Sequence, residues 1–166
     1  MRSGFARLIR LLSMRRGVGA SLALLLVACA PSPVPLRDAN APLSASTRFD
    51  TARFAGVWHI VASTANDLTG PVSVDVADAN ETLVFTGGLT GVYTVDKPGV
   101  LSALGGGTLV VMWLDETHRT AALGDAQGRF ALLLSRAPSI PSDKRAAAFG
   151  VFDFYGWDTR QIEERQ

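Results

Sequence analysis

The chain has few of the residues that build disulfide-bonded, metal-binding or nucleic-acid-binding proteins. Its 166 residues include one cysteine and two histidines, and its formal net charge is +1. A single cysteine excludes an internal disulfide framework, so a hydrophobic core has to hold any folded domain together. His59 and His118 have no cysteine or acidic partner at metal-ligand spacing. We therefore predict no metal site.

Motifs for nucleophilic or acid–base catalysis are also missing. The chain has no Gly-x-Ser-x-Gly sequence, and its two histidines define no catalytic triad. The adjacent acidic residues Asp115-Glu116 and Glu163-Glu164 diverge in a strand or turn, so we expect solvated side chains there. The sequence predicts a protein that is not an enzyme and that uses no cofactor.

Residues 1–28 are typical of a lipoprotein signal peptide. Five arginines and no acidic residue accompany an apolar run, 18–28, that is short for a transmembrane helix. The run ends in Leu26-Val27-Ala28-Cys29, which resembles the bacterial lipobox, where the cysteine is lipidated and becomes the first mature residue. The only cysteine of the chain lies at that position. A plain secretory signal with an incidental cysteine is the alternative.

Removal of the signal peptide changes the charge and the expected partners. Loss of its five arginines leaves 11 Lys and Arg against 15 Asp and Glu, a net charge of about −4. No basic stripe remains to replace the counterions of a nucleic acid, so we expect none as a partner. Acylation of Cys29 would anchor the protein to a membrane without spanning it. Ala30 stands where lipoproteins retained in the inner membrane commonly carry Asp, and this resemblance favours the outer membrane, facing the periplasm.

The mature chain divides into a tether, 29–48, and a folded domain, 49–166. The tether has four prolines and no periodic apolar face. In the domain, short β-like runs alternate with turn residues, and we predict strands at 57–63, 72–76, 82–86, 91–95, 100–104, 108–114, 120–123 and 129–136. Such short connections favour antiparallel neighbours. We therefore predict an all-β fold, an eight-stranded antiparallel up-and-down barrel.

One helix is predicted after the strands. Ser142 suits its N-cap and Gly156 its C-terminal stop. Its apolar stripe consists of residues 148, 149, 152 and 155, and its polar face lacks the dense Lys and Arg of a membrane-surface helix. We expect this C-terminal α-helix to pack against the outside of the barrel. Residues 160–165 are predicted to add a last short strand.

The chain resembles the lipocalins, most closely the bacterial lipocalin and apolipoprotein D branch, over about residues 49–166. Gly56-Val57-Trp58 is similar to the Gly-x-Trp of the family's first strand. Residues 134–138, Leu-Ser-Arg-Ala-Pro, look like the end of its eighth strand, where an arginine stacks on that tryptophan. Residues 156–159, Gly-Trp-Asp-Thr, look like the Gly-Phe-Asp that follows its helix. The resemblance implies a calyx that binds a fatty acid such as palmitate, or a lysophospholipid.

The chain departs from the family pattern in two respects. Trp58 is followed by His59-Ile60-Val61 in place of the usual Tyr-Glu-Ile. The span of 78 residues from Trp58 to Arg136 is short for this branch. An eight-stranded barrel is either filled by side chains or holds one small ligand. The function therefore stays open between a membrane-anchored carrier of a hydrophobic ligand and a filled-barrel envelope scaffold or protein-interaction module.

Strand geometry gives candidate residues for the barrel interior. Alternation places Trp58, Ile60 and Ala62 on one face of the first strand and Phe130, Leu132, Leu134 and Arg136 on one face of the eighth. Further candidates, whose facing stays open between cavity and core or rim, are Tyr93, Met112 and Trp113. A guanidinium over the Trp58 ring would contribute about 0.5–2 kcal/mol and would seal one end of the barrel. Ligand binding is then expected at the opposite, open end.

Overall fold

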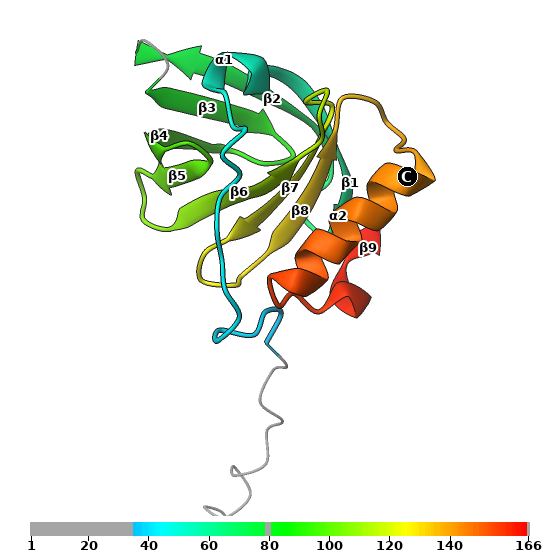
Figure 1. Cartoon of the computed structure of the whole chain (residues 1–166). Coiled ribbons are helices and arrows are strands. Elements are labelled where there is room, and N and C mark those ends of the chain that lie inside the picture. The colour runs from blue at the N-terminus through cyan, green and yellow to red at the C-terminus, as the bar shows by residue number, and fades with distance from the viewer. Residues whose placement is uncertain (1–34, 79–80, 166) are drawn as a thin grey trace, which may run out of the picture. The chain divides into compact units, whose positions relative to one another are not determined.

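Nine antiparallel strands form one sheet in the computed structural model, which describes residues 35–78 and 81–165 (Figure 1). Eight of them close into the predicted up-and-down barrel, because β1 pairs with both β2 and β8. The predicted signal peptide, 1–28, and Cys29 lie outside the described residues. The strands are β1 (Gly56–Ser63), β2 (Gly70–Ala77), β3 (Thr82–Gly87), β4 (Gly91–Lys97), β5 (Val100–Ala103), β6 (Thr108–Leu114), β7 (Thr120–Asp125), β8 (Ala131–Ser135) and β9 (Glu163–Glu164).

Turn chemistry explains why β8 begins two residues later than predicted. The Asp125 carboxylate accepts backbone N–H bonds from Gln127 and Arg129, at 3.0 and 3.2 Å. These bonds hold residues 125–129 in a tight turn, so residue 129 does not enter the sheet. The predicted last strand, 160–165, is confirmed only in part: residues 163–164 form β9, in which Glu164 pairs with Ala62 of β1. Residues Thr159–Gln161 form a short 3₁₀ helix, η2, instead.

The alternating turns define two ends of the barrel. In a meander, the turns after β1, β3, β5 and β7 lie at one end, which we call the mouth. The turns after β2, β4, β6 and β8 lie at the other, which we call the closed end. Helix α1 (Thr51–Phe54) leads directly into β1 and therefore belongs to the closed end, where Asp50 caps it by accepting the Arg53 N–H at 2.8 Å.

Buried side chains form two separate clusters, one inside the barrel and one outside. The interior cluster consists of Phe49, Phe54, Trp58, Ile60, Val72, Val74, Leu83, Phe85, Leu89, Tyr93, Leu101, Leu109, Val111, Leu114, Ala121, Leu123, Leu132 and Leu134. The outer cluster consists of Val61, Ala62, Val110, Met112, Ala122, Ala131, Leu133, Ala148, Phe152, Trp157 and Ile162. The β6–β7–β8 side of the barrel is therefore buried on both faces.

The longest helix of the described residues, α2 (Ser142–Phe154), lies across the outside of the barrel, as predicted (Figure 1). It buries Ala148 and Phe152 in the outer cluster. The N-cap is Pro141 and not Ser142, because Pro141 has extended backbone angles and the helix begins only after it. Gly156 has a φ of +81° one residue after the C-cap, which suits its predicted role as the stop. None of the described helices is long and apolar enough to cross a membrane.

Residues 35–48, predicted to be part of the tether, instead lie along the barrel. The buried Arg37 side chain donates hydrogen bonds to the carbonyl oxygens of Tyr155, Ala41 and Pro42, at 2.9, 2.6 and 2.8 Å. The Ser46 N–H donates to the Val111 carbonyl at 2.8 Å. The segment includes turns at residues 39–40 and 47–48, and its own backbone bonds together with the Arg37 side chain hold it in place. Of the predicted tether, only residues 29–34 precede the described chain.

Substitution of Gly124 tests the docking of the C-terminal segment on the barrel. A Cβ at this position would lie 2.5 Å from the buried Trp157 ring, so Gly124→Ala should lower the free energy of unfolding by about 1–3 kcal/mol. The control is Gly150→Ala in the exposed part of α2, where a Cβ meets nothing within 4 Å. It should raise stability by about 1 kcal/mol. Urea unfolding of the chain from residue 29 measures the free energy of unfolding of both variants. Equal changes in that free energy would contradict the docking of the C-terminal segment on the barrel.

Candidate functional site

The barrel interior is the candidate site, and it contains part of the predicted set. Ile60, Tyr93, Leu132 and Leu134 belong to the interior cluster, and Phe130 packs against it while partly exposed. These side chains are apolar apart from the Tyr93 hydroxyl. The interior therefore suits an apolar guest and offers little to a polar one.

Ala62, Met112 and Trp113 lie in or against the outer cluster, which corrects the placement that strict alternation gave Ala62. The pairing of β1 with β8 shifts register between Ile60 and Ala62, and that of β6 with β7 shifts between Val111 and Trp113. A β-bulge inserts an extra residue on one strand, so the alternation of faces is broken there. These three residues therefore support α2 and do not line the interior.

Sequence reasoning missed most of the interior because it applied alternation only to the first and last strands of the barrel. The same rule applied to β3 selects Leu83 and Phe85, both fully buried inside. Phe54 was overlooked because it precedes the first strand. Its ring centroid lies 5.0 Å from that of Trp58 and 6.3 Å from that of Phe85, so it joins the closed end to the centre of the barrel.

Trp58 and Arg136 form the closed end. Trp58 is fully buried, and its indole N–H donates to the Phe54 carbonyl at 2.8 Å. The Arg136 guanidinium carbon lies 3.7 Å from the centroid of the Trp58 ring. The cation therefore stacks on the indole face, which is the geometry of a cation–π contact.

The same guanidinium binds the backbone that leads into β1. It donates to the carbonyl oxygens of Val57, Arg53, Ala55 and Phe54, at 2.9, 2.8, 2.8 and 3.2 Å. Burial lowers the pKa of the Arg136 side chain, and the neighbouring Arg119 charge lowers it further. Four carbonyl acceptors compensate for this desolvation. Arg136 thus ties the end of β8 to the start of β1.

Gly56 is required for this arrangement. Its φ is +99°, a conformation that side chains with a Cβ rarely adopt. A Cβ at this position would also lie 3.2 Å from Nη1 of Arg136. The glycine of the Gly-x-Trp pattern therefore lets the chain turn beneath the arginine.

Loop side chains cover the mouth. Leu89, in the β3–β4 turn, belongs to the interior cluster. Leu68 from the β1–β2 loop, Ala103 at the end of β5 and Phe130 just before β8 pack against that cluster while partly exposed. The cover of the interior at this end thus comes largely from connecting segments, which move more readily than paired strands.

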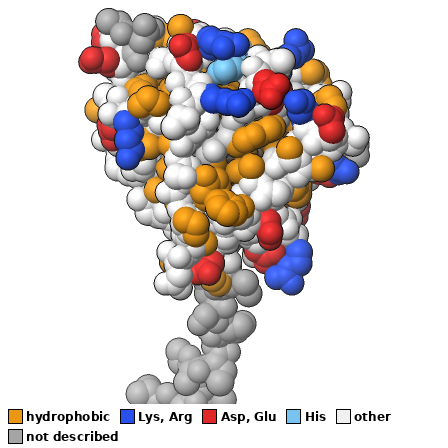
Figure 2. All heavy atoms as spheres, in the orientation of Figure 1, with side chains coloured by type: hydrophobic (Ala, Val, Ile, Leu, Met, Phe, Trp, Pro, Cys, Tyr) orange, Lys and Arg blue, Asp and Glu red, His pale blue; other side chains and the backbone are white. Residues whose placement is uncertain are grey.

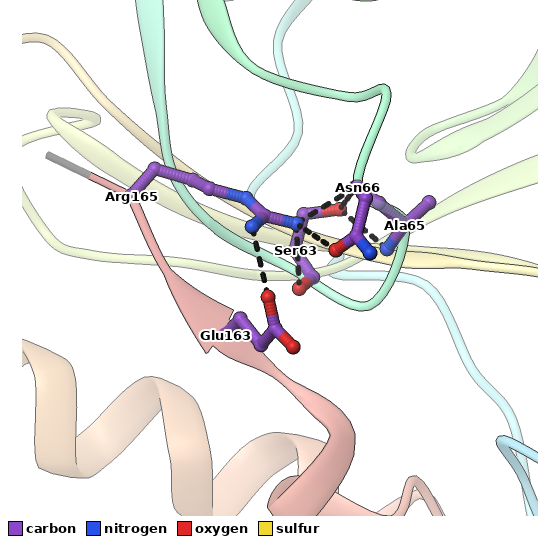
Figure 3. Close-up of polar contacts among 5 residues, drawn as sticks. All are labelled: Ser63, Ala65, Asn66, Glu163 and Arg165. Atoms are coloured by element: carbon purple, nitrogen blue, oxygen red, sulfur yellow. Dashed lines mark hydrogen bonds and ion pairs between the residues drawn. The ribbon is translucent and has the colours of Figure 1, made fainter.

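Arg165 fixes the β1–β2 loop in place (Figure 3). Its Nη2 donates to the Ala65 carbonyl at 2.9 Å and to Oδ1 of Asn66 at 3.3 Å, while Nη1 lies 3.1 Å from Oε2 of Glu163. Only 17% of the Arg165 side chain is exposed. The C-terminal segment therefore holds the loop that carries Leu68 over the mouth.

One ion pair stands at the mouth beside Tyr93. Asp125 is buried and accepts from Nε and Nη2 of Arg129, at 3.0 and 2.6 Å, whereas 60% of the Arg129 side chain is exposed. Burial raises the pKa of Tyr93, and the Asp125 charge adds to this while Arg129 opposes it. The mouth therefore offers an exposed guanidinium and a protonated phenol next to an apolar interior.

Four hollows described on the protein lie elsewhere, since none of them is lined by the interior cluster. One of about 500 Å³ lies between the β6–β7 turn and the start of α2, beside Asp115, Arg119 and Lys144. Burial raises the pKa of Asp115, but bonds from Thr117 and two backbone N–H groups, with the Lys144 charge, bring it below its ordinary value. Across residues 35–78 and 81–165, no three His, Cys, Asp or Glu side chains gather as metal ligands would.

Comparison with known proteins identifies the fold. No protein family description matches the chain, and no curated protein matches it. Lobster apocrustacyanin A1 superimposes with a TM-score of 0.56 and 16% identity, over 69% of this chain and 78% of that chain. Apocrustacyanin C1 superimposes with a TM-score of 0.53 and 18% identity, over 68% of this chain and 76% of that chain. The cockroach allergen Per a 4 superimposes with a TM-score of 0.56 and 15% identity, over 76% of this chain and 94% of that chain.

These three proteins have the lipocalin fold, and so does this chain. The predicted resemblance to lipocalins is confirmed at the level of the fold. Identities of 15–18% carry no information on ligand or activity.

Replacement of Arg136 tests the closed end. Arg136→Lys keeps the charge but loses the planar fork that reaches four carbonyl groups, so it should lower the free energy of unfolding by about 3 kcal/mol. Arg119→Lys is the matched control, because Arg119 is exposed, and it should change stability by less than about 0.5 kcal/mol. Thermal and urea unfolding measure both. An Arg136→Lys variant as stable as the parent chain would refute the role given to the guanidinium.

Proposed function

We propose that the chain is a lipoprotein of the bacterial cell envelope that binds a small hydrophobic ligand through the mouth of its barrel. One observation carries this proposal. The interior is continuous and almost wholly apolar, is sealed at one end by Trp58 and Arg136, and is covered at the other end largely by loop side chains. A ligand that displaces Leu68 and Phe130 reaches apolar surface without disturbing the sheet.

The shape of the interior favours a slender ligand. Its own side chains fill it, since most members of the interior cluster are fully buried. To enter the filled interior, a single acyl chain has to displace a smaller volume of side chains than a ring system does. It gains about 25 cal/mol for each Å² of apolar surface removed from water. We therefore propose a fatty acid, such as palmitate, or a lysophospholipid.

Arg129 suits the acidic group of such a ligand. Two of its nitrogens bind Asp125, and Nη1 has no hydrogen-bond partner among the described residues. An anionic headgroup at the mouth would accept from this nitrogen and from the Tyr93 hydroxyl. The acyl chain would then point inward, toward Leu132.

The lipid anchor and the branch of the family rest on sequence resemblance. Cys29 in a lipobox-like sequence supports acylation, and Ala30 supports transfer to the outer membrane, facing the periplasm. The Trp58–Arg136 stack and the sequence 156–159 support a place in the bacterial lipocalin and apolipoprotein D branch.

A filled-barrel scaffold without a ligand is the second candidate. The completely buried interior favours it, because a barrel already packed with Trp58, Phe54 and Phe85 is stable without a guest. In that case a surface of the protein would carry the function, through a protein partner in the envelope.

Truncation at the mouth distinguishes the two candidates. Phe130→Ala removes part of the cover, so it should tighten the binding of a fluorescent C16 fatty acid several-fold. Val57→Ala is the control, since Val57 is an apolar residue 55% exposed at the closed end, and it should leave the affinity unchanged. Displacement titration measures the dissociation constants. The matching C16 alcohol should bind more weakly than the acid at low salt, because it lacks the charge that Arg129 recognises.

Failure of both the parent chain and Phe130→Ala to bind any member of a lipid panel would refute the carrier and favour the scaffold. Pull-down from envelope extracts would then be expected to yield a protein partner.

A further inference from the structure

The described chain begins at the mouth end of the barrel. The Cβ of Arg37 lies 3.2 Å from the position that a Cβ on Gly128, in the β7–β8 turn, would occupy. The Asp38 N–H donates to the Gly156 carbonyl at 2.8 Å, just after the C-terminal end of α2. In Figure 1 this first segment starts below the turn that joins β7 to β8. Residue 35 is therefore a neighbour of the mouth and not of the closed end.

Chain length limits how far the mouth can lie from a lipid anchor. Cys29 precedes Pro35 by six residues, and six residues span at most about 20 Å when fully extended. The eight residues of β1, at about 3.3 Å each and tilted in the barrel, separate the two ends by a further distance of about 20 Å. An anchor at Cys29 therefore lies within about 20 Å of residue 35 at the mouth, whereas the closed end lies one barrel height farther along β1.

The two most exposed large apolar side chains among the described residues lie at the same end, whereas Val57, 55% exposed, lies at the closed end. Leu104 is 80% exposed in the turn after β5, and Gly107 of that turn lies against the Arg129 side chain. Phe154 is 67% exposed and precedes Tyr155, whose carbonyl accepts from Arg37. Large apolar side chains exposed to this degree are suited to the interface between lipid and water.

Both paired and unpaired charges lie at this end. Arg129 binds Asp125, and Arg160, beside Pro35 and Gly156, binds Asp158 through Nε at 2.8 Å. Asp38 and Asp153, which line the same hollow as Arg160, form no ion pair with any described residue. Figure 2 shows hydrophobic side chains gathered over the middle and lower part of one face, toward the end where the described chain begins. These two arginines are neutralised and the unpaired groups are acidic, so contact of this end with a lipid surface would depend on apolar burial and not on charge attraction.

We propose that the mouth of the barrel faces the lipid bilayer that holds the anchor, with Leu104 and Phe154 at its interface. This proposal rests on the acylation of Cys29 given above as part of the proposed function. In this orientation an acyl chain passes between bilayer and barrel interior along a short path that avoids bulk water. The sealed end, with Trp58 and Arg136, faces away from the membrane.

Energy transfer from an added tryptophan to a dansyl lipid headgroup tests the orientation. The mature chain is coupled through Cys29, its only thiol, to phosphatidylcholine vesicles that contain a maleimide lipid and the dansyl lipid. Leu104→Trp marks the mouth and Val57→Trp, 55% exposed beside Arg136, marks the closed end. The added transfer, relative to the unsubstituted chain, should be at least twofold greater for Leu104→Trp.

Equal transfer from the two positions, or greater transfer from Val57→Trp, would overturn the proposed orientation. Arg119→Trp in the exposed β6–β7 turn is a second closed-end marker, so the comparison does not depend on one variant. Chemical coupling supplies the anchor, so the result is independent of natural lipidation. Lipidation is tested separately, by incorporation of labelled palmitate into the parent chain and its loss in Cys29→Ser. Absence of incorporation would refute the anchor and not the geometry of the barrel.

Discussion

The contact between the Arg136 guanidinium and the Trp58 ring is the constraint on which the rest of the structure depends. One side chain at the end of β8 stacks on the first-strand indole at 3.7 Å and binds four carbonyl groups of residues 53–57. It therefore joins the last barrel strand to the first where the sheet closes. Gly56 permits the close approach, and Phe54 accepts the indole N–H. The covering side chains that a ligand could displace therefore lie at the other end, the mouth.

The mouth is built differently from the closed end. Leu68 and Phe130 pack over the interior from connecting segments, and the loop that carries Leu68 is held by Arg165 from the C-terminal segment. Such side-chain contacts hold a segment less firmly than full pairing in the sheet does, so the mouth has the lower local stability. A filled interior and a displaceable cover are compatible with binding of a slender apolar ligand. They are less compatible with a large or polar one.

Much of this organisation is predictable from the chain. Arg136 follows Gly56 by 80 residues and Trp58 by 78, yet the resemblance to lipocalins pairs Arg136 with Trp58 correctly. Both motifs mark strand ends that closure of the barrel brings together. Ala62 was misplaced because a bulge depends on the partner strand and not on local alternation. Composition predicts a tether for residues 35–48, because their bonds to the barrel and to the end of α2 involve backbone groups, which composition does not reveal.

Methyl NMR of the chain from residue 29 during titration with a C16 fatty acid tests most directly whether an acyl ligand enters at the mouth. Chemical-shift changes are expected at Leu68, Leu89 and Leu132, with little change at Leu114 near the closed end. Changes confined to outer-cluster methyls such as Leu133, or no changes at saturating fatty acid, would contradict entry at the mouth.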